Sequence, residues 1–158
     1  MAVPEALRDF WNAFARACGG ADEAQFCEAF AFGDSPALAD ELAALVLQGT
    51  KRATASALWT YQAEAKPLPR PGQLSIVTSG AGVPLCVIQT LAVEVLPFDQ
   101  IGADFAASEG EGDSSLAFWR EAHTQFFSRE CAQVGRVFQP DMPVVCERFR
   151  LRYPPAGG

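Results

Sequence analysis

The chain has 158 residues, 49% of them hydrophobic, and a formal net charge of −7. This length and composition predict one domain over residues 1–158, with a core that needs neither disulfides nor metal ions. The acidic balance argues against broad binding to duplex DNA, and no stretch approaches the roughly 20 apolar residues of a membrane-spanning helix. We therefore expect no membrane and no duplex DNA among its partners.

The five cysteines are scattered, odd in number and nowhere spaced as C-x-x-C. Neither a disulfide framework nor a zinc ribbon is therefore indicated. The N-terminus also lacks the basic and apolar regions of a signal peptide. We interpret the cysteines as buried thiols in a reducing compartment and expect a cytoplasmic protein.

The first half of the chain has the spacing of helices. Apolar residues recur every three or four positions over 4–18, which predicts an amphipathic helix within an N-terminal helical extension of residues 1–25. Ser35 and Pro36 are typical of a helix start and predict a second helix over 36–48. Residues 55–65 could begin extended, but we favour a short helix over 57–64.

The second half changes to the spacing of strands. Residues 74–78, 85–94 and 144–153 are rich in β-branched and apolar side chains, and they predict mostly antiparallel strands. Asp113 or Ser114 can cap a further helix that ends near Arg129. Helices followed by strands, a late helix and a closing strand predict an α+β fold with a curved sheet or small barrel. Residues 154–158 are expected to form a disordered tail.

The segment 49–56, Gly-Thr-Lys-Arg-Ala-Thr-Ala-Ser, concentrates reactive groups directly after the second predicted helix. Gly49 suits the left-handed conformation that ends helices. Lys51 and Thr54 are three residues apart, so they face opposite sides of a regular strand but can meet on a turn. One interpretation is an active site, and the other is a solvated pair of cations, Lys51 and Arg52, at a helix end.

A second polar cluster follows further along the chain. Glu109, Glu111 and Asp113 alternate with glycines, and such a run can bind a hard cation, place one acid in a pocket, or cap the next helix. Its spacing lacks the EF-hand pattern. His123 is the only histidine, which argues against a histidine-based metal site, and no G-x-S-x-G element supports a Ser-His-Asp hydrolase. Together with Arg120, this histidine could orient a ligand.

Several short motifs together resemble the ASCH domain family, in the larger bacterial type that carries an N-terminal helix. The resemblance covers residues 26–153 and rests on Phe30–Gly33, Ala39–Leu42, Gly49–Ser56, Leu68–Pro69, Gly72, Glu109–Asp113, Trp119–Arg120, His123 and Phe126–Phe127. It implies a PUA-like fold, either a small β-barrel or a strongly curved mixed sheet flanked by helices. Such folds are associated with RNA binding.

Some small bacterial ASCH proteins remove the acetyl group from N4-acetylcytidine with a lysine, a threonine and a glutamate. The resemblance places these catalytic roles on Lys51, Thr54 and Glu109, without a cofactor. In this mechanism Lys51 deprotonates Thr54, which attacks the acyl carbon, while Glu109 protonates the departing amine. Lys51 can act as a base near neutrality only if burial or a neighbouring cation lowers its pKa from about 10.4.

Further residues are predicted to bind the substrate, a nucleoside or single-stranded RNA. Aromatic rings can stack on the base, and polar or charged groups can orient it. The set comprises Arg52, Ser56, Trp59, Tyr61, Glu111, Trp119, Arg120 and His123.

Two other functions stay open. The first is an RNA-binding or nucleotide-binding module, in which Lys51, Arg52 and the alternating arginines of the last strand, residues 148–152, hold phosphate. The second is a metal-dependent ribonuclease with a divalent cation at the carboxylates of residues 109–113. The sequence leaves the exact substrate and the oligomeric state open.

Overall fold

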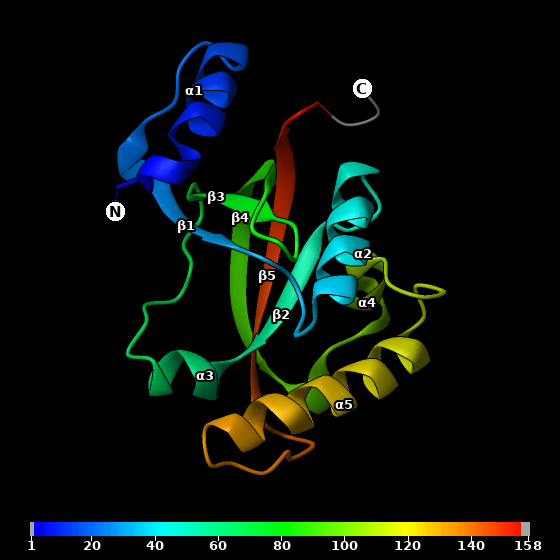
Figure 1. Ribbon diagram of the computed structural model, residues 1–158. Coiled ribbons are helices and arrows are strands. Elements are labelled where there is room, and N and C mark those ends of the chain that lie inside the picture. The colour runs from blue at the N-terminus through cyan, green and yellow to red at the C-terminus, as the bar shows by residue number, and fades with distance from the viewer. Residues whose placement is uncertain (1, 156–158) are drawn as a thin grey trace.

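The computed structural model describes residues 2–155 as a five-stranded mixed sheet flanked by helices (Figure 1). The strands are β1 (Phe26–Phe30), β2 (Ala53–Ala57), β3 (Leu74–Thr78), β4 (Pro84–Pro97) and β5 (Pro143–Tyr153). The helices are α1 (Arg8–Ala17), α2 (Pro36–Leu47), α3 (Leu58–Ala63), α4 (Ala103–Glu109) and α5 (Leu116–Gln133). No helix among the described residues is long and apolar enough to cross a membrane.

The strand order is β1-β3-β4-β5-β2, so β1 and β2 form the two edges of an open sheet. Strand β1 pairs with β3 in parallel, and the other three pairings are antiparallel. The α+β fold is therefore confirmed as an open mixed sheet flanked by helices. A closed barrel does not form, because the two edge strands do not pair with each other.

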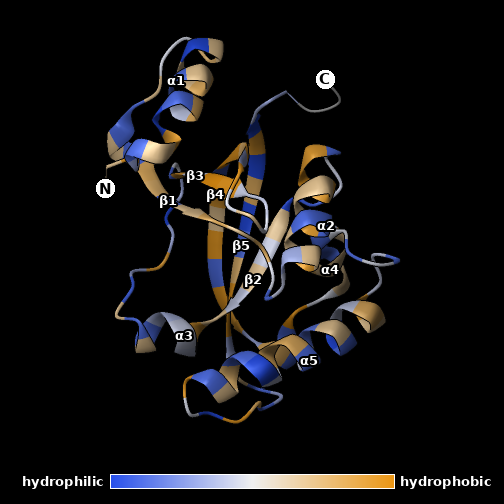
Figure 2. Ribbon diagram, in the orientation of Figure 1, coloured by the Kyte–Doolittle hydropathy of each residue, from blue (hydrophilic) through white to orange (hydrophobic). Residues whose placement is uncertain are grey.

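Strand β3 is buried along its whole length because helices cover both of its faces. On one face, Leu74 and Ile76 pack with Trp11 and Phe14 of α1. On the other face, Val77 belongs to a cluster that includes residues of α2. All five β3 residues are buried, and three of them, Leu74, Ile76 and Val77, are nonpolar (Figure 2).

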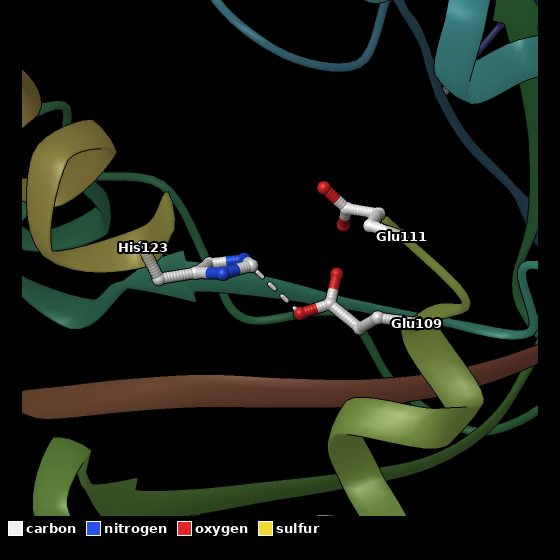
Figure 3. Close-up of side chains that lie close together, drawn as sticks. All are labelled: Glu109, Glu111 and His123. Atoms are coloured by element: carbon white, nitrogen blue, oxygen red, sulfur yellow. Dashed lines mark ion pairs between the residues drawn. The ribbon is translucent and has the colours of Figure 1, made fainter. Parts of the chain in front are cut away.

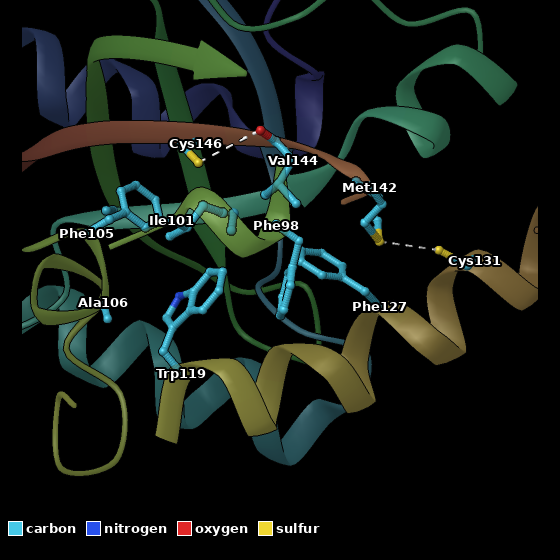
Figure 4. Packing of buried hydrophobic residues seen from close by; sticks show 13 residues of the cluster. Phe98, Ile101, Phe105, Ala106, Trp119, Phe127, Cys131, Met142, Val144 and Cys146 are labelled. Atoms are coloured by element: carbon cyan, nitrogen blue, oxygen red, sulfur yellow. Dashed lines mark hydrogen bonds between the residues drawn. The ribbon is translucent and has the colours of Figure 1, made fainter. Parts of the chain in front are cut away.

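A third cluster joins α4 and α5 to the sheet (Figure 4). Every second residue of β2 is a buried alanine, and these are Ala53, Ala55 and Ala57. The small side chains let α5 pack closely, through Trp119 and Phe127. The intervening residues of β2, Thr54 and Ser56, point to the opposite side of the sheet. The core therefore fixes which β2 side chains remain available for chemistry.

Most predicted elements are present, and three were missed. The helices expected over 4–18, 36–48 and 57–64 correspond to α1, α2 and α3, and the three predicted strands correspond to β3, β4 and β5. Strand β1 was not predicted, and neither was β2, although residues from 55 on were considered as possibly extended. Helix α4, which ends at the first glutamate of the acidic run, was also not predicted.

The arginines of β5 and the residues after it were both covered by predictions from the sequence. Arginines occupy alternate positions of β5, as predicted, and Arg150 and Arg152 both donate hydrogen bonds to Oε1 of Gln89. Arg148 instead donates to Oγ of Ser108. Of the tail expected to be disordered, residues 156–158 lie outside the described residues.

Candidate active site

The turn after α2 places Lys51 inside the protein. Gly49 adopts a φ of 82°, and the amides of Thr50 and Lys51 both donate to the carbonyl oxygen of Leu45. The amide of Arg52 then donates to the carbonyl oxygen of Ser108 in α4. Because Lys51 precedes β2, strand alternation does not separate it from Thr54. Only 2% of Lys51 is exposed.

The Lys51 ammonium ends between two carboxylates. Its Nζ lies 2.8 Å from Oε1 of Glu109 and 3.1 Å from Oε2 of Glu111. Oε2 of Glu109 accepts a hydrogen bond from the indole Nε1 of Trp119 and lies 3.1 Å from Nε2 of His123. Figure 3 shows His123 of α5 pointing toward Glu109, with Glu111 beside it. The buried cluster thus joins the turn after α2, the end of α4 and the middle of α5.

The geometry of His123 indicates an imidazolium. Its Nδ1 lies 2.9 Å from the carbonyl oxygen of Trp119, which can only accept, so Nδ1 carries a proton. Its Nε2 faces the Glu109 carboxylate, which also accepts. Burial alone lowers the pKa of His123, but Glu109 outweighs burial and raises it above its ordinary value. With Lys51 and His123 positive, the two glutamates balance the cluster when both are ionised.

The two carboxyl groups differ in their affinity for a proton. Burial alone raises the pKa of Glu109, but Lys51 and His123 outweigh burial and hold that pKa well below its usual range. Burial, reinforced by the neighbouring Glu109, raises the pKa of Glu111. Glu109 therefore takes up a proton less readily than Glu111 does.

The same contacts keep Lys51 protonated. Burial alone lowers the pKa of its ammonium, but Glu109 and Glu111 outweigh burial and raise the pKa above its ordinary value. The condition for Lys51 to act as a general base, a lowered pKa, is therefore not met. Arg52 and Arg120, two cations that could lower this pKa if they lay close to Lys51, are both exposed. In this environment the ammonium is a fixed positive charge.

The glycines of the acidic run explain how its two glutamates converge. Gly110 follows the last residue of α4 with a φ of 66°, and a Cβ there would lie 2.5 Å from the carbonyl oxygen of Thr50. Only glycine allows this approach of α4 to the lysine turn. Asp113 points elsewhere, because its exposed carboxylate accepts a hydrogen bond from the amide of Ser115. The carboxylate set expected at residues 109–113 is therefore reduced to its first two members.

A pocket of about 100 Å³ opens above the cluster between α2 and α5. It brings together all three residues predicted as catalytic, with nonpolar walls from α2 and α5. Its lining comprises Leu38, Leu42, Lys51, Thr54, Ala55, Glu109, Glu111, Ala122, His123, Phe126 and Arg129. Arg129 and Leu38 were not predicted as site residues, because they come from elements that only the fold brings together.

The residues predicted to bind substrate separate into four groups. Glu111 and His123 line this pocket, and Ser56 and Tyr61 line a neighbouring pocket. Trp119 is 2% exposed and is stacked between rings of Phe98 and His123, so its indole leaves no face for a nucleobase.

The other members of that set lie outside the pocket. The Arg136 guanidinium lies 4.5 Å from the ring centroid of Trp59, and thus covers this indole. Arg52 and Arg120 are exposed and do not line the pocket. Among the three aromatic residues of this set, Tyr61 is therefore the one that lines a pocket.

A divalent cation fits this site poorly. Glu109, Glu111 and His123 each offer a ligand atom, and these atoms lie within 4.8 Å of one another. However, the Lys51 ammonium already lies within hydrogen-bonding distance of both carboxylates. A divalent ion added beside the lysine would exceed the charge of the two glutamates and repel Lys51. We therefore derive no chemical step through a metal.

The chain matches the ASCH domain family over residues 28–153. It is similar to the crystal structure of an ASCH domain from Lactobacillus crispatus JV V101, with 37% sequence identity, 96% of each chain covered and a TM-score of 0.86. It is also similar to protein EF3133 from Enterococcus faecalis V583, with 34% identity, 92% of this chain and 86% of that chain covered, and a TM-score of 0.83. No curated protein matches the chain. Because the family match spans most of the sequence, and helix α1 precedes it as expected, the chain belongs to the ASCH domain family.

Proposed function

We propose that the chain is an amidohydrolase that removes an acyl group from the amine of a modified nucleoside, with N4-acetylcytidine as the reference substrate. The observation that carries this proposal is the convergence of Lys51, Thr54 and Glu109 on one pocket. These residues come from separate parts of the chain, and a purely structural ion cluster would not need a hydroxyl beside it. Membership of the ASCH family supports a nucleoside or RNA ligand.

The charges of the cluster support different roles from those expected of the triad alone. Lys51, held as an ammonium, is suited to stabilise the oxyanion that develops on the acyl oxygen. Glu109 keeps the lysine charged and in place. Glu111 is the better proton carrier, because its pKa is raised while that of Glu109 is lowered. Glu111 therefore replaces Lys51 as general base and Glu109 as general acid.

The proposed reaction has two steps. Oγ of Thr54 forms a bond to the acyl carbon, its proton passes to Glu111, and the bond from the acyl carbon to nitrogen breaks as Glu111 returns the proton to the amine. Water then attacks the acyl-threonine ester, again losing a proton to Glu111, which passes it to Thr54. The products are cytidine and acetate. The small volume of the pocket suits an acetyl group rather than a long acyl chain.

A second candidate is recognition of a nucleoside or single-stranded RNA without turnover. It is favoured by the engagement of Lys51 with two carboxylates, and by the fact that Thr54 makes no side-chain hydrogen bond within residues 2–155. In this alternative, the ammonium and the pocket walls only hold the ligand. The two candidates differ in whether the acyl bond is cleaved.

The experiment is a hydrolysis assay with N4-acetylcytidine in which cytidine is quantified by chromatography. We expect wild-type protein to release cytidine and Glu111→Gln to lose at least about a hundredfold in kcat, as is typical for a removed general base. Glu94→Gln changes an exposed glutamate and is the matched control. In wild type, kcat/KM should fall as the pH drops through a value above about 4.5, because Glu111 must be ionised to accept a proton. Binding of the nucleoside without release of cytidine would favour the second candidate.

A further inference from the structure

A second pocket, of about 150 Å³, is lined by residues of both edge strands, β1 and β2. It shares Thr54 with the pocket above the ion cluster. The polar and ionisable side chains that line it include Cys27, Thr54, Ser56, Tyr61, Ser75 and Glu147. Both volumes are below the roughly 300–1,000 Å³ of pockets that enclose drug-sized ligands. Each pocket therefore suits one part of a small ligand that lies against Thr54 and extends into both pockets.

Glu147 is the acceptor of this second pocket. It pairs directly with Thr54 in the register of β5 and β2. Its Oε2 accepts a hydrogen bond of 2.7 Å from Oγ1 of Thr90, which fixes the carboxyl group. Its Oε1 has no protein donor within residues 2–155, although the residue lines the pocket. Burial also raises the pKa of Glu147, which reflects the hydration that the carboxylate has lost. An N–H donor of a ligand would restore the missing hydrogen bond.

Tyr61 provides a flat wall beside this acceptor. The Lys66 ammonium lies 5.3 Å from the centroid of the Tyr61 ring and forms a 2.8 Å ion pair with Glu28 of β1. Burial raises the pKa of Tyr61 to about 12, so its hydroxyl stays neutral. The ammonium therefore covers one face of the Tyr61 ring, and the other face can lie against a planar group.

We propose that this second pocket is a recognition subsite for a planar heterocycle bearing an exocyclic amine, and that Oε1 of Glu147 accepts a hydrogen bond from its N–H. The proposal rests on the proposed function, because Thr54 joins the two pockets and the acylated nitrogen must lie beside it. Glu147 is thus a specificity residue and not a member of the reacting set.

The charges of the second pocket select against other ligands. Glu147 and Glu28 both lie at the pocket, and Lys66 is already paired with Glu28, so a phosphate group would face net negative charge. A heterocycle with a carbonyl in place of the amine would present an oxygen to Glu147. Two acceptors would then face each other without a proton between them, which costs binding energy. Cytidine should therefore bind better than uridine, which has a carbonyl at the corresponding position.

The test is calorimetric titration of the whole protein with cytidine and with uridine. We expect cytidine to bind at least about tenfold more tightly than uridine, because the carbonyl of uridine would set its oxygen against Oε1 of the half-buried Glu147 with no proton between them. Glu147→Gln should remove this preference, since its amide can donate to a carbonyl. Glu94→Gln, which changes an exposed glutamate on β4, should keep it. Equal affinities of wild type for both nucleosides, or an unchanged preference in Glu147→Gln, would overturn the proposal.

These titrations separate the subsite from the reaction. A preference for cytidine that depends on Glu147, in a protein that does not hydrolyse N4-acetylcytidine, supports the subsite and refutes the amidohydrolase. Hydrolysis without any preference for cytidine supports the amidohydrolase and refutes the subsite. The comparison of the two nucleosides on wild type needs no variant, so it decides the matter even if Glu147→Gln fails to fold.

Discussion

Removal of the Lys51 ammonium gives the sharpest prediction about stability. The variant Lys51→Met keeps an unbranched side chain of similar length but leaves Glu109 buried with half of its positive partners. Both side chains of this pair are only 1% exposed, so water cannot replace the lost charge. Loss of one partner from a buried pair costs about 3–5 kcal/mol. For a chain of this size, the melting temperature should fall by roughly 6–20 °C.

Two further variants check the reason for this loss. Lys66→Met removes an ammonium from an ion pair whose side chains are 40% and 28% exposed, and it should cost less than about 1 kcal/mol. The double variant Lys51→Met/Glu109→Gln removes the stranded charge, so it should be more stable than Lys51→Met alone. Urea unfolding measured for all three supplies the free energies. A loss below about 1 kcal/mol in Lys51→Met, or no recovery in the double variant, would refute the buried pair.

Three other variants test the scaffold around the pair. His123→Gln should lower the free energy of unfolding most below about pH 6.5, and its loss relative to wild type should shrink as the pH rises through the raised folded-state pKa of His123. Urea titrations across this pH range measure the loss. A loss that does not depend on pH would contradict the imidazolium. Trp119→Phe deletes the indole donor to Glu109 and should cost about 1.5–3 kcal/mol in unfolding free energy, whereas an unchanged value would mean that the hydrogen bond adds nothing. Gly110→Ala should lower the free energy of unfolding by about 1–3 kcal/mol or more, because it combines a left-handed φ with a clash against Thr50. Thermal unfolding at the wild-type temperature would disprove the close approach of Gly110 to Thr50.

The sequence predicted the elements whose spacing is strong and local. Helix α2 begins at Ser35, whose hydroxyl accepts from the amide of Leu38, and the helix-start pattern reveals this cap. Strand β1 was missed because its five residues, Phe-Cys-Glu-Ala-Phe, do not alternate clearly, and it gains its order by pairing with β3. Helix α4 was missed because the glycines after it are typical of a loop. In the structure, Gly110 only ends the helix.

The candidate site was predictable in its residue types but not in its charges. The motif at 49–56 and the family resemblance identify Lys51 and Thr54, and the pocket brings these two together with Glu109. The sequence could not show that Glu111, 60 residues away from Lys51, would share its ammonium. That contact depends on the left-handed turn at Gly110. It changes the expected role of Lys51 from a base to a fixed cation.

Glu147 shows the same limit. It lies in a strand whose alternating arginines drew attention to the other face, and nothing local distinguishes it from a solvated acid. Only the pairing of β5 with β2 places it opposite Thr54 and in the same pocket, beside the proposed reaction.

The measurement that tests the central claim most directly is turnover of N4-acetylcytidine by wild type and by Thr54→Val, with binding of the same compound measured in parallel. The valine keeps the shape of the threonine and removes the hydroxyl. We predict that wild type releases cytidine and acetate in equal amounts, and that Thr54→Val binds the compound but releases neither. Turnover by Thr54→Val at the wild-type rate, or binding without release by wild type, would contradict the account.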